Sequence, residues 1–265
     1  MYKYKSTGWF TKVITILVLL FFLAPLIVII FASFSPSALV TFPPQGFSLV
    51  WYKNIFDSST NFMGGLKNSL IVAFLATIID IIIGVPAAIA ITRNNFKGKD
   101  AIASFFASPM YVPSITFSFV LLQMFALMGR VPASLKIFIG HLVIILPYII
   151  RNTYSILANF NWTLEEASAS LGASPSYTIV KVTLPLIKPG IISGALLSFL
   201  YSFDEAVLSS MLNSPKFITL PVRILNYMEF AFDPTLAAIS SVLIIFSLLL
   251  ILLMEKFVGL NMFLK

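Results

Sequence analysis

Six long apolar stretches, separated by short polar segments, dominate the pattern along the chain. They cover residues 13–34, 70–91, 101–128, 137–157, 190–211 and 235–257. Each provides the roughly 20 apolar residues that a helix needs to cross the hydrocarbon core of a bilayer. A membrane-spanning barrel would instead show short segments of alternating apolar and polar residues. The pattern therefore predicts an all-α integral membrane protein with six transmembrane helices.

The composition supports a membrane environment. Of the 265 residues, 59% are hydrophobic and only 10% are charged, whereas a typical soluble domain has about 25% charged residues. These proportions argue against a soluble enzyme and a disordered chain. Cysteine is absent, which argues against a disulfide-stabilised secreted domain. The first apolar stretch exceeds the ~7–15 residues of a signal-peptide core, so we expect a retained helix.

The basic residues predict the orientation of the helices. Alternate tails and loops, counted from the N-terminus, hold eleven of the seventeen Lys and Arg residues, and the other set holds six. Because cytoplasmic loops carry the excess of basic residues, both termini are predicted to be cytoplasmic. Topology thus explains most of the net charge of +7. The basic residues are too dispersed to indicate nucleic-acid binding.

Two features predict how individual helices are shaped and packed. Pro109 and Pro113 lie four residues apart in the third stretch and predict a bent helix, either as a packing kink or as part of a gate. In the fifth stretch, small residues recur every four positions, which lets that helix approach a neighbour closely. These small residues are Gly190, Gly194, Ser198 and Ser202.

The segment 152–189 is the longest connection on the predicted cytoplasmic side, and its first half indicates a short helix. Thr163 and Glu166 have the spacing of a capping box, so we expect Thr163 as the N-cap and Glu166 reaching back to it. Glu165 adds a second acidic residue to the first turn, where the helix dipole favours negative charge. Gly172 is expected to end the helix.

The second half of the segment indicates another short helix. Ser174-Pro175 is expected to start it, since proline is favoured at the first helical position. Leu184-Pro185 is expected to end it. Two short helices outside the membrane, with few charges and a modest apolar face, suit docking into a groove on a partner protein. The alternative is a structured loop without a partner.

The spacing of residues in this segment resembles the EAA loop of ABC importer permeases, E-A-A-x3-G-x9-I-x-L-P. The matching letters start at Glu166 and Gly172 and end at Pro185, with Ser168 for the second Ala and Val182 for Ile. The resemblance implies a coupling helix that sits in a groove of an ATPase subunit. It assigns this coupling role to Glu165, Glu166, Ala167, Ser168, Gly172, Ala173, Ser174, Pro175, Leu184 and Pro185.

The likeness extends over nearly the whole chain. Residues 47–52 and 66–73 resemble the first outer loop and the second helix of this family. Residues 171–195 and 202–205 resemble most closely the second permease of spermidine/putrescine-type importers, and residues 219–223 and 229–234 fit the same subgroup. This implies one transmembrane permease domain over residues 1–265, of the type I ABC importer fold, in the bacterial cytoplasmic membrane. It also implies a second permease subunit, two copies of an ATPase subunit and an extracytoplasmic substrate-binding protein. The outer loops 35–65, 129–136 and 213–234 would dock that binding protein.

The chain is not expected to hydrolyse ATP. Its only Gly-Lys pair, Gly98-Lys99, is followed by Asp100 and lacks the pattern of a phosphate-binding Walker A loop. ATP and Mg are therefore expected on the partner ATPase, with no cofactor on this chain. The single histidine, His141, belongs to no Cys/His cluster, so a packing or hydrogen-bonding role is expected rather than metal binding. No catalytic or metal-ligating residue is predicted.

Three acidic residues, Asp80, Asp204 and Glu205, fall within the predicted spans. Ionisable groups at such depth are costly and therefore mark functional candidates. Tyr201 shares the helix face of Asp204 and Glu205, and aromatic faces attract ammonium groups. We expect these four residues to line the path of a cationic amine. The alternative is that the acids hydrogen-bond to the companion permease or to Ser and Asn side chains.

The resemblance favours a polyamine as the substrate. Related importers carry other amino compounds, such as opines or aminophosphonates, and these remain alternatives. A secondary transporter or an ion channel is a further alternative, since either can have six helices and buried acids. Neither class has a place for the EAA-like loop, and no repeated filter motif or inverted repeat is visible.

Overall fold

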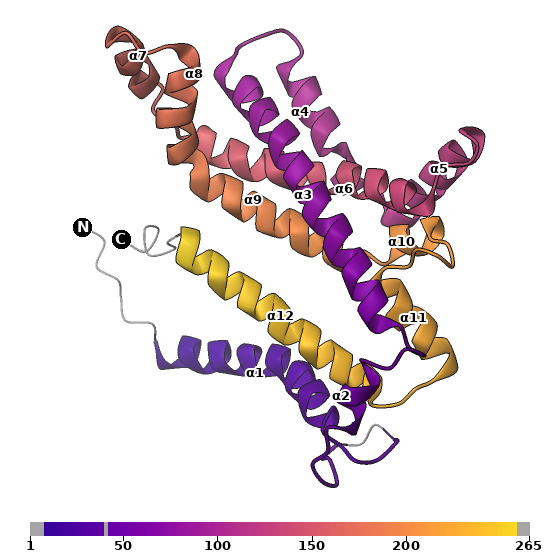
Figure 1. The fold of residues 1–265 in the computed structure, drawn as a ribbon. Coiled ribbons are helices and arrows are strands. Elements are labelled where there is room, and N and C mark those ends of the chain that lie inside the picture. Colours follow the sequence, from indigo (N-terminus) through magenta and orange to yellow (C-terminus); the bar gives the residue numbers. More distant parts are fainter. Residues whose placement is uncertain (1–7, 40–41, 259–265) are drawn as a thin grey trace. The chain divides into compact units, whose positions relative to one another are not determined.

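The computed structural model describes residues 8–39 and 42–258, and this part of the chain is almost entirely helical (Figure 1). It contains no strand, only an isolated bridge between Ser214 and Phe217. The chain divides into two compact units. Unit 1 consists of Met1–Phe62 and Ile224–Leu248, and unit 2 of Met63–Arg223 and Leu249–Lys265. Lys3, Lys5 and Lys265, which contribute to the predicted orientation, lie outside the described residues.

Unit 1 contains α1 (Trp9–Ala32), α2 (Val50–Asn54), and most of α11 (Leu220–Phe230) and α12 (Thr235–Val258). Polar contacts hold its loops together. The Asn54 amide donates to Thr235 Oγ1 at 3.3 Å, and the Trp51 indole N–H donates to the Ser35 carbonyl at 2.7 Å. The α2 segment is thereby fixed to the end of α1 and the start of α12.

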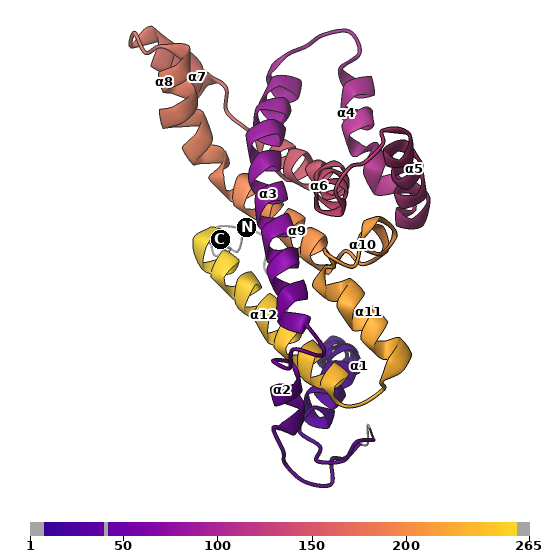
Figure 2. The same ribbon diagram turned by 45° about the vertical axis from the view of Figure 1, so that its right-hand side comes forward.

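Unit 2 carries the remaining helices. These are α3 (Phe62–Arg93), α4 (Lys99–Ala107), the 3-10 turn η1 (Ser108–Tyr111), α5 (Ser114–Leu127), α6 (Ala133–Leu157), α7 (Thr163–Ser170), α8 (Pro175–Thr178), the π-helical turn η2 (Ile179–Thr183), α9 (Leu184–Asp204) and α10 (Val207–Leu212). Figures 1 and 2 both place α7 and α8 at the same end of this unit as the connection between α3 and α4.

Five helices among the described residues are long and apolar enough to cross a membrane, and the number is six if a bent helix pair is counted as one span. The bent pair joins Lys99–Tyr111 to Ser114–Leu127 at 101°. Pro109 lies in η1 and Pro113 is the N-cap of α5, so the predicted bend of the third helix is confirmed. The six predicted stretches correspond to these six spans.

The predicted small-residue stripe packs α9 against α6. A Cβ added at Gly190 would lie 2.9 Å from the Asn152 carbonyl oxygen, and one at Gly194 would lie 3.1 Å from Ile149 Cα. One turn further, the Ser198 hydroxyl donates to the Ile145 carbonyl at 3.2 Å. Small residues permit this backbone approach, and van der Waals contact is the main gain when helices associate in lipid. The predicted close approach of the fifth span to a neighbour is confirmed.

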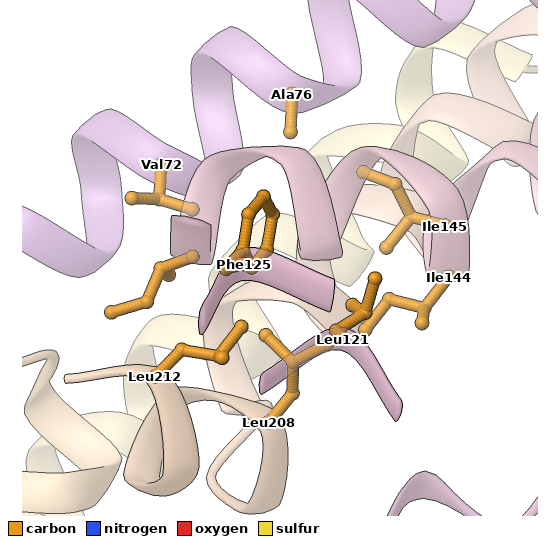
Figure 3. Close-up of a cluster of buried hydrophobic side chains, with 9 residues drawn as sticks. Val72, Ala76, Leu121, Phe125, Ile144, Ile145, Leu208 and Leu212 are labelled. Carbon is orange, nitrogen blue, oxygen red and sulfur yellow. The ribbon is translucent and has the colours of Figure 1, made fainter. Parts of the chain in front are cut away.

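A buried apolar cluster joins α10 to three other helices (Figure 3). It is formed by Val72 and Ala76 of α3, Leu121 and Phe125 of α5, Ile137, Ile144 and Ile145 of α6, and Leu208 and Leu212 of α10. Figure 3 shows Leu208 and Leu212 directed towards the side chains of α5 and α6. The cluster fixes the short α10 just beyond the end of α9.

The predicted fifth stretch, residues 190–211, is wrong as a single helix. Glu205 has an extended backbone with ψ 108°, so α9 ends at Asp204 and α10 starts again at Val207. Apolar periodicity alone gave no sign of this break, because the residues on both sides are equally apolar.

Candidate functional site

The start of α7 differs from the capping box expected from sequence. Thr163 is already the first helical residue, with Trp162 before it, and no side chain of the N-cap residue bonds the helix. Asn161 Oδ1 instead accepts hydrogen bonds from the Thr163 hydroxyl at 2.6 Å and from its backbone N–H at 3.2 Å. The predicted N-cap at Thr163 is therefore wrong, since an Asn two residues earlier satisfies the first N–H group.

The end of α7 has the geometry that Gly172 predicts. Gly172 adopts φ +85°, a left-handed conformation that costs glycine little. Its N–H donates to the Ala169 carbonyl at 2.9 Å, and the Ala173 N–H donates to the Ser168 carbonyl at 3.2 Å. These two bonds form a Schellman motif. The predicted stop at Gly172 is confirmed.

The second helix of the loop starts as predicted but does not end as predicted. Ser174 is the N-cap, and its hydroxyl accepts from the Tyr177 N–H at 3.3 Å, with Pro175 at the first position. The second helix does not end at Leu184-Pro185, because Pro175–Asp204 is one continuous helical run. The π turn η2 ends at Thr183, two residues before Pro185. Its wider hydrogen-bonding pattern accommodates a ring that would clash with the carbonyl four residues earlier in a regular helix.

The two consecutive acids of α7 have opposite environments. Glu165 is buried, with 6% of its side chain exposed, and Arg93 Nη2 lies 3.0 Å from its Oε2. The Thr183 hydroxyl donates to Glu165 Oε1 at 2.5 Å. Glu166, by contrast, is exposed. Sequence reasoning could not identify these partners, because Arg93 belongs to α3, much earlier in the chain, and Thr183 lies in a π turn that no local pattern indicated.

The loop exposes three large apolar side chains among polar ones. Leu171 is 90% exposed, Tyr177 56% and Leu164 43%. Beside them lies a cavity of about 360 Å³, lined by Arg93, Trp162, Glu165, Glu166, Ala169, Ala173, Pro175 and Thr178. Of the predicted coupling residues, this arrangement exposes Glu166, Ala167, Gly172, Ser174, Pro175 and Pro185, partly buries Ser168, Ala173 and Leu184, and buries Glu165.

A second group of predicted residues lies at the break between α9 and α10. Glu205 is 8% exposed, and its Oε1 accepts the Leu208 N–H at 2.9 Å, so its carboxylate satisfies the start of α10. Asp204 is exposed, and among the described residues its carboxylate has no hydrogen-bond or ion-pair partner. The two consecutive acids therefore divide into one used by the fold and one available to a ligand.

His141 of α6 holds both sides of this break. Its Nδ1 lies 2.7 Å from Ser202 Oγ of α9, and its Nε2 lies 3.0 Å from Ser209 Oγ of α10. The imidazole is 1% exposed, so the ring and both hydroxyls are hidden from solvent. The predicted hydrogen-bonding role of His141 is confirmed.

Two tyrosines line the same pocket as the free carboxylate. The rings of Tyr148 and Tyr201 lie 5.1 Å apart between centroids. Together with both acids of the break they line a pocket of about 310 Å³, whose members are Tyr148, Leu197, Leu200, Tyr201, Asp204 and Glu205. Both rings also line a neighbouring pocket of about 280 Å³ against the bend around Pro109–Ser114. Aromatic faces beside a carboxylate suit an ammonium group.

The structure brings together three of the four predicted pathway residues. Tyr201, Asp204 and Glu205 share the pocket, and sequence reasoning missed Tyr148, which enters through the close packing of α6 on α9. Asp80 lies on α3, is 1% exposed and does not line this pocket. Its Oδ2 has no hydrogen-bond partner among the described residues.

Known proteins resemble the chain over most of its length. The family model of the binding-protein-dependent transport system inner membrane component matches residues 80–260. The chain is 32% identical to the spermidine/putrescine transport system permease protein PotC of Haemophilus influenzae, over 80% of this chain and 82% of that protein. It is 30% identical to the putrescine transport system permease protein PotI of Escherichia coli, over 88% and 84%. A putative 2-aminoethylphosphonate transport system permease protein PhnV of Salmonella paratyphi A is also 30% identical, over 92% of each.

Solved structures share the fold at lower identity. A bacterial ABC transporter involved in the import of the acidic polysaccharide alginate matches 98% of this chain and 99% of its own, with a TM-score of 0.66 and 18% identity. The MetNI methionine ABC transporter matches 75% of this chain and 94% of its own, with a TM-score of 0.62 and 18% identity. The fold is that of a type I ABC importer permease.

Proposed function

Because the chain belongs to the family of binding-protein-dependent transport system inner membrane components and is a permease subunit of an ABC importer, we propose that it carries a small cationic amine, in particular a polyamine such as spermidine or putrescine. Permeases of this family work with separate ATPase subunits and a substrate-binding protein in the inner membrane. We further propose a single permease domain with both termini in the cytoplasm, paired with a second permease and two ATPase copies.

The observation that carries the amine proposal is the pocket at the α9–α10 break. Asp204 offers a carboxylate without a partner among the described residues, in a pocket that the rings of Tyr148 and Tyr201 also line. A passing ammonium group would gain attraction from both the carboxylate and the aromatic faces. The similarity to PotC and PotI supports a polyamine. An aminophosphonate is the second candidate, supported by the similarity to PhnV. The ammonium group of an aminophosphonate would pair with the same Asp204 carboxylate.

Uptake by the complete importer in proteoliposomes tests the proposal. We expect Asp204→Asn to lower putrescine uptake by about 10- to 100-fold, because a hydrogen bond to a charged group contributes about 1.5–3 kcal/mol. Asp100→Asn, the same chemical change in the first turn of α4, is the matched control and should transport normally. Normal uptake by Asp204→Asn would exclude the carboxylate from the path. Uptake of 2-aminoethylphosphonate but not of putrescine by the wild type would favour the second candidate.

We propose that α7 and α8 dock the ATPase through their exposed side. The apolar side chains of Leu164, Leu171 and Tyr177 and the carboxylate of Glu166 support this role, since exposed apolar groups mark interaction surfaces. Gly172→Asp should strongly weaken co-purification of the ATPase, because it adds a charged side chain to the exposed surface at a turn whose φ of +85° favours glycine. Gly98→Asp, the same change at another glycine of positive φ but outside α7 and α8, is the control. ATPase binding by the Gly172 variant equal to that by the control would contradict docking through this loop.

A further inference from the structure

Glu165 joins three helical segments through one carboxylate. Its Oε2 pairs with Arg93 at the end of α3, and its Oε1 accepts from Thr183 in η2, the turn that leads into α9. Glu165 and Thr183 are buried, with 6% and 0% exposed, whereas the Arg93 side chain is 48% exposed. Within the described part of the chain this is the only salt bridge. The carboxylate therefore lies where α7 meets two of the long helices.

The bonds to α9 and to α3 differ in what they add. The chain itself already connects α7 to α9 through α8 and η2, and the hydroxyls of Ser168 and Thr178 share a hydrogen bond of 2.8 Å that fastens α7 to α8. No such covalent route leads directly from α7 to α3, which comes much earlier in the sequence. The Arg93–Glu165 pair is thus the contact by which α3 would follow a displacement of α7.

From the proposed coupling role of α7, we infer that the Arg93–Glu165 pair transmits its motion to α3, so that α3 and α9 move together. A buried carboxylate separated from its only cation is costly. The pair therefore favours movement of α3 with α7 over separation of the two. Arg93 and Glu165 are positioning residues that act through the helices and do not contact the substrate.

The packing further along α3 shows where such a displacement leads. A Cβ added at Gly84 would lie 2.8 Å from Ile149 Cγ2 of α6, and one at Gly194 of α9 would lie 3.1 Å from Ile149 Cα. The helices α3 and α9 thus hold α6 at the same residue. Tyr148, which directly precedes Ile149 in α6, lines the proposed amine pocket. Joint movement of α3 and α9 would therefore act on α6 at the level of that pocket.

The absence of cysteine makes a direct test practical. Spin labels on Asn95→Cys, just beyond α3, and Ser170→Cys, at the end of α7, report the distance between the two segments in the complete importer. Both positions are exposed. We expect one narrow distance distribution with and without ATP. In the Arg93→Gln background we expect the distribution to broaden or to shift with ATP, and Arg93→Lys should restore the narrow form.

A transport measurement accompanies the distances. In Arg93→Gln, the number of ATP molecules hydrolysed per putrescine taken up should rise by about 2-fold to about 30-fold. This range corresponds to the change that a single mutation typically makes in a coupling free energy. Glu165→Gln should raise it similarly, and the double variant should be no worse than either single variant.

Three results would overturn the inference. These are an unchanged distance distribution in Arg93→Gln, failure of Arg93→Lys to restore it, or loss of the ATPase on purification of Arg93→Gln, which would place the pair in docking instead. The failure of the proposed substrate is distinguishable, because wild-type importer would then take up no putrescine while the ATP-dependent distances would still be measurable.

Discussion

Glu165-Glu166 in α7 and Asp204-Glu205 at the α9–α10 break are both pairs of consecutive acids, and in each pair the fold uses one carboxylate and exposes the other. Glu165 is paired with Arg93 and Thr183, and Glu205 accepts the Leu208 N–H. Glu166 and Asp204 are exposed. Glu205 thus hydrogen-bonds a backbone N–H of its own chain, a partner that neither the pathway hypothesis nor its alternative named.

The two pairs differ in what surrounds the exposed acid. The loop that carries Glu166 also exposes Leu164, Leu171 and Tyr177, and exposed apolar groups mark interaction surfaces. Beside Asp204 lie two tyrosine rings that line a pocket, an environment sized for a small cation. The comparison therefore assigns a protein partner to one exposed acid and a small ligand to the other. Substitutions at both sites can break or sharpen this assignment.

The largest effect on stability is expected at His141, which supports the second pair. His141→Leu leaves the hydroxyls of Ser202 and Ser209 without their partner in a site that solvent does not reach. We expect a loss of about 2–4 kcal/mol from unpaired hydroxyls and imperfect packing. The apparent melting temperature of the purified complex measures it. Adding Ser202→Ala and Ser209→Ala should recover much of the loss, because removing all partners leaves nothing unpaired. No recovery would mean that imidazole packing alone matters.

An intermediate effect is expected at the first pair, with an unusual asymmetry. Arg93→Met leaves the buried Glu165 carboxylate without its cation and should lower stability by about 1–3 kcal/mol. Glu165→Met should cost less, because the half-exposed Arg93 side chain can return to water. Melting curves of the two variants, measured side by side, give the order. The reverse order would show that the carboxylate contributes mainly through Thr183.

The extent to which sequence predicted these sites depends on the range of the interactions. Apolar run length gave the six spans, and local motifs gave the Gly172 stop and the Ser174 N-cap, because each depends on a few neighbouring residues. The predicted capping box was wrong because Asn161, two residues before Thr163, accepts the Thr163 N–H that Glu166 was expected to bond. No local pattern indicated the helix break at Glu205, whose two sides His141 bonds, or the π turn before the continuous run through Pro185.

Contacts between distant segments account for the remaining differences. Glu165 and Glu166 look equivalent in sequence, and the capping argument favoured Glu166 as the structural residue. The position of Arg93 reverses these roles, because the end of α3 lies against only one side of α7. Tyr148 was missed for the same reason, since only the packing of α6 on α9 brings its ring to Tyr201.

A smaller effect is expected at Glu205. In Glu205→Gln the amide oxygen can still accept the Leu208 N–H, so the loss of stability should be about 0.5–1 kcal/mol. Glu205→Leu removes the acceptor and should cost more, about 1–2 kcal/mol. Melting curves distinguish them, and putrescine uptake by the Gln variant shows whether the charge also serves transport. Equal losses in both variants would mean that the hydrogen bond to Leu208 contributes little.

The smallest effect on stability is expected at the two exposed acids, and it separates their roles most clearly. Asp204→Asn and Glu166→Gln should each change the melting temperature little, with a cost within about 0.5 kcal/mol, since neither carboxylate has a side-chain partner among the described residues. Their functional losses should differ in kind. Asp204→Asn should retain the ATPase on purification and lose uptake, because its pocket faces a small ligand. Glu166→Gln should weaken ATPase retention at high salt, because a charge at the rim of a protein interface acts mainly through screened attraction. If both variants lost the same property, the two exposed acids would share one role and the contrast drawn from their surroundings would be wrong.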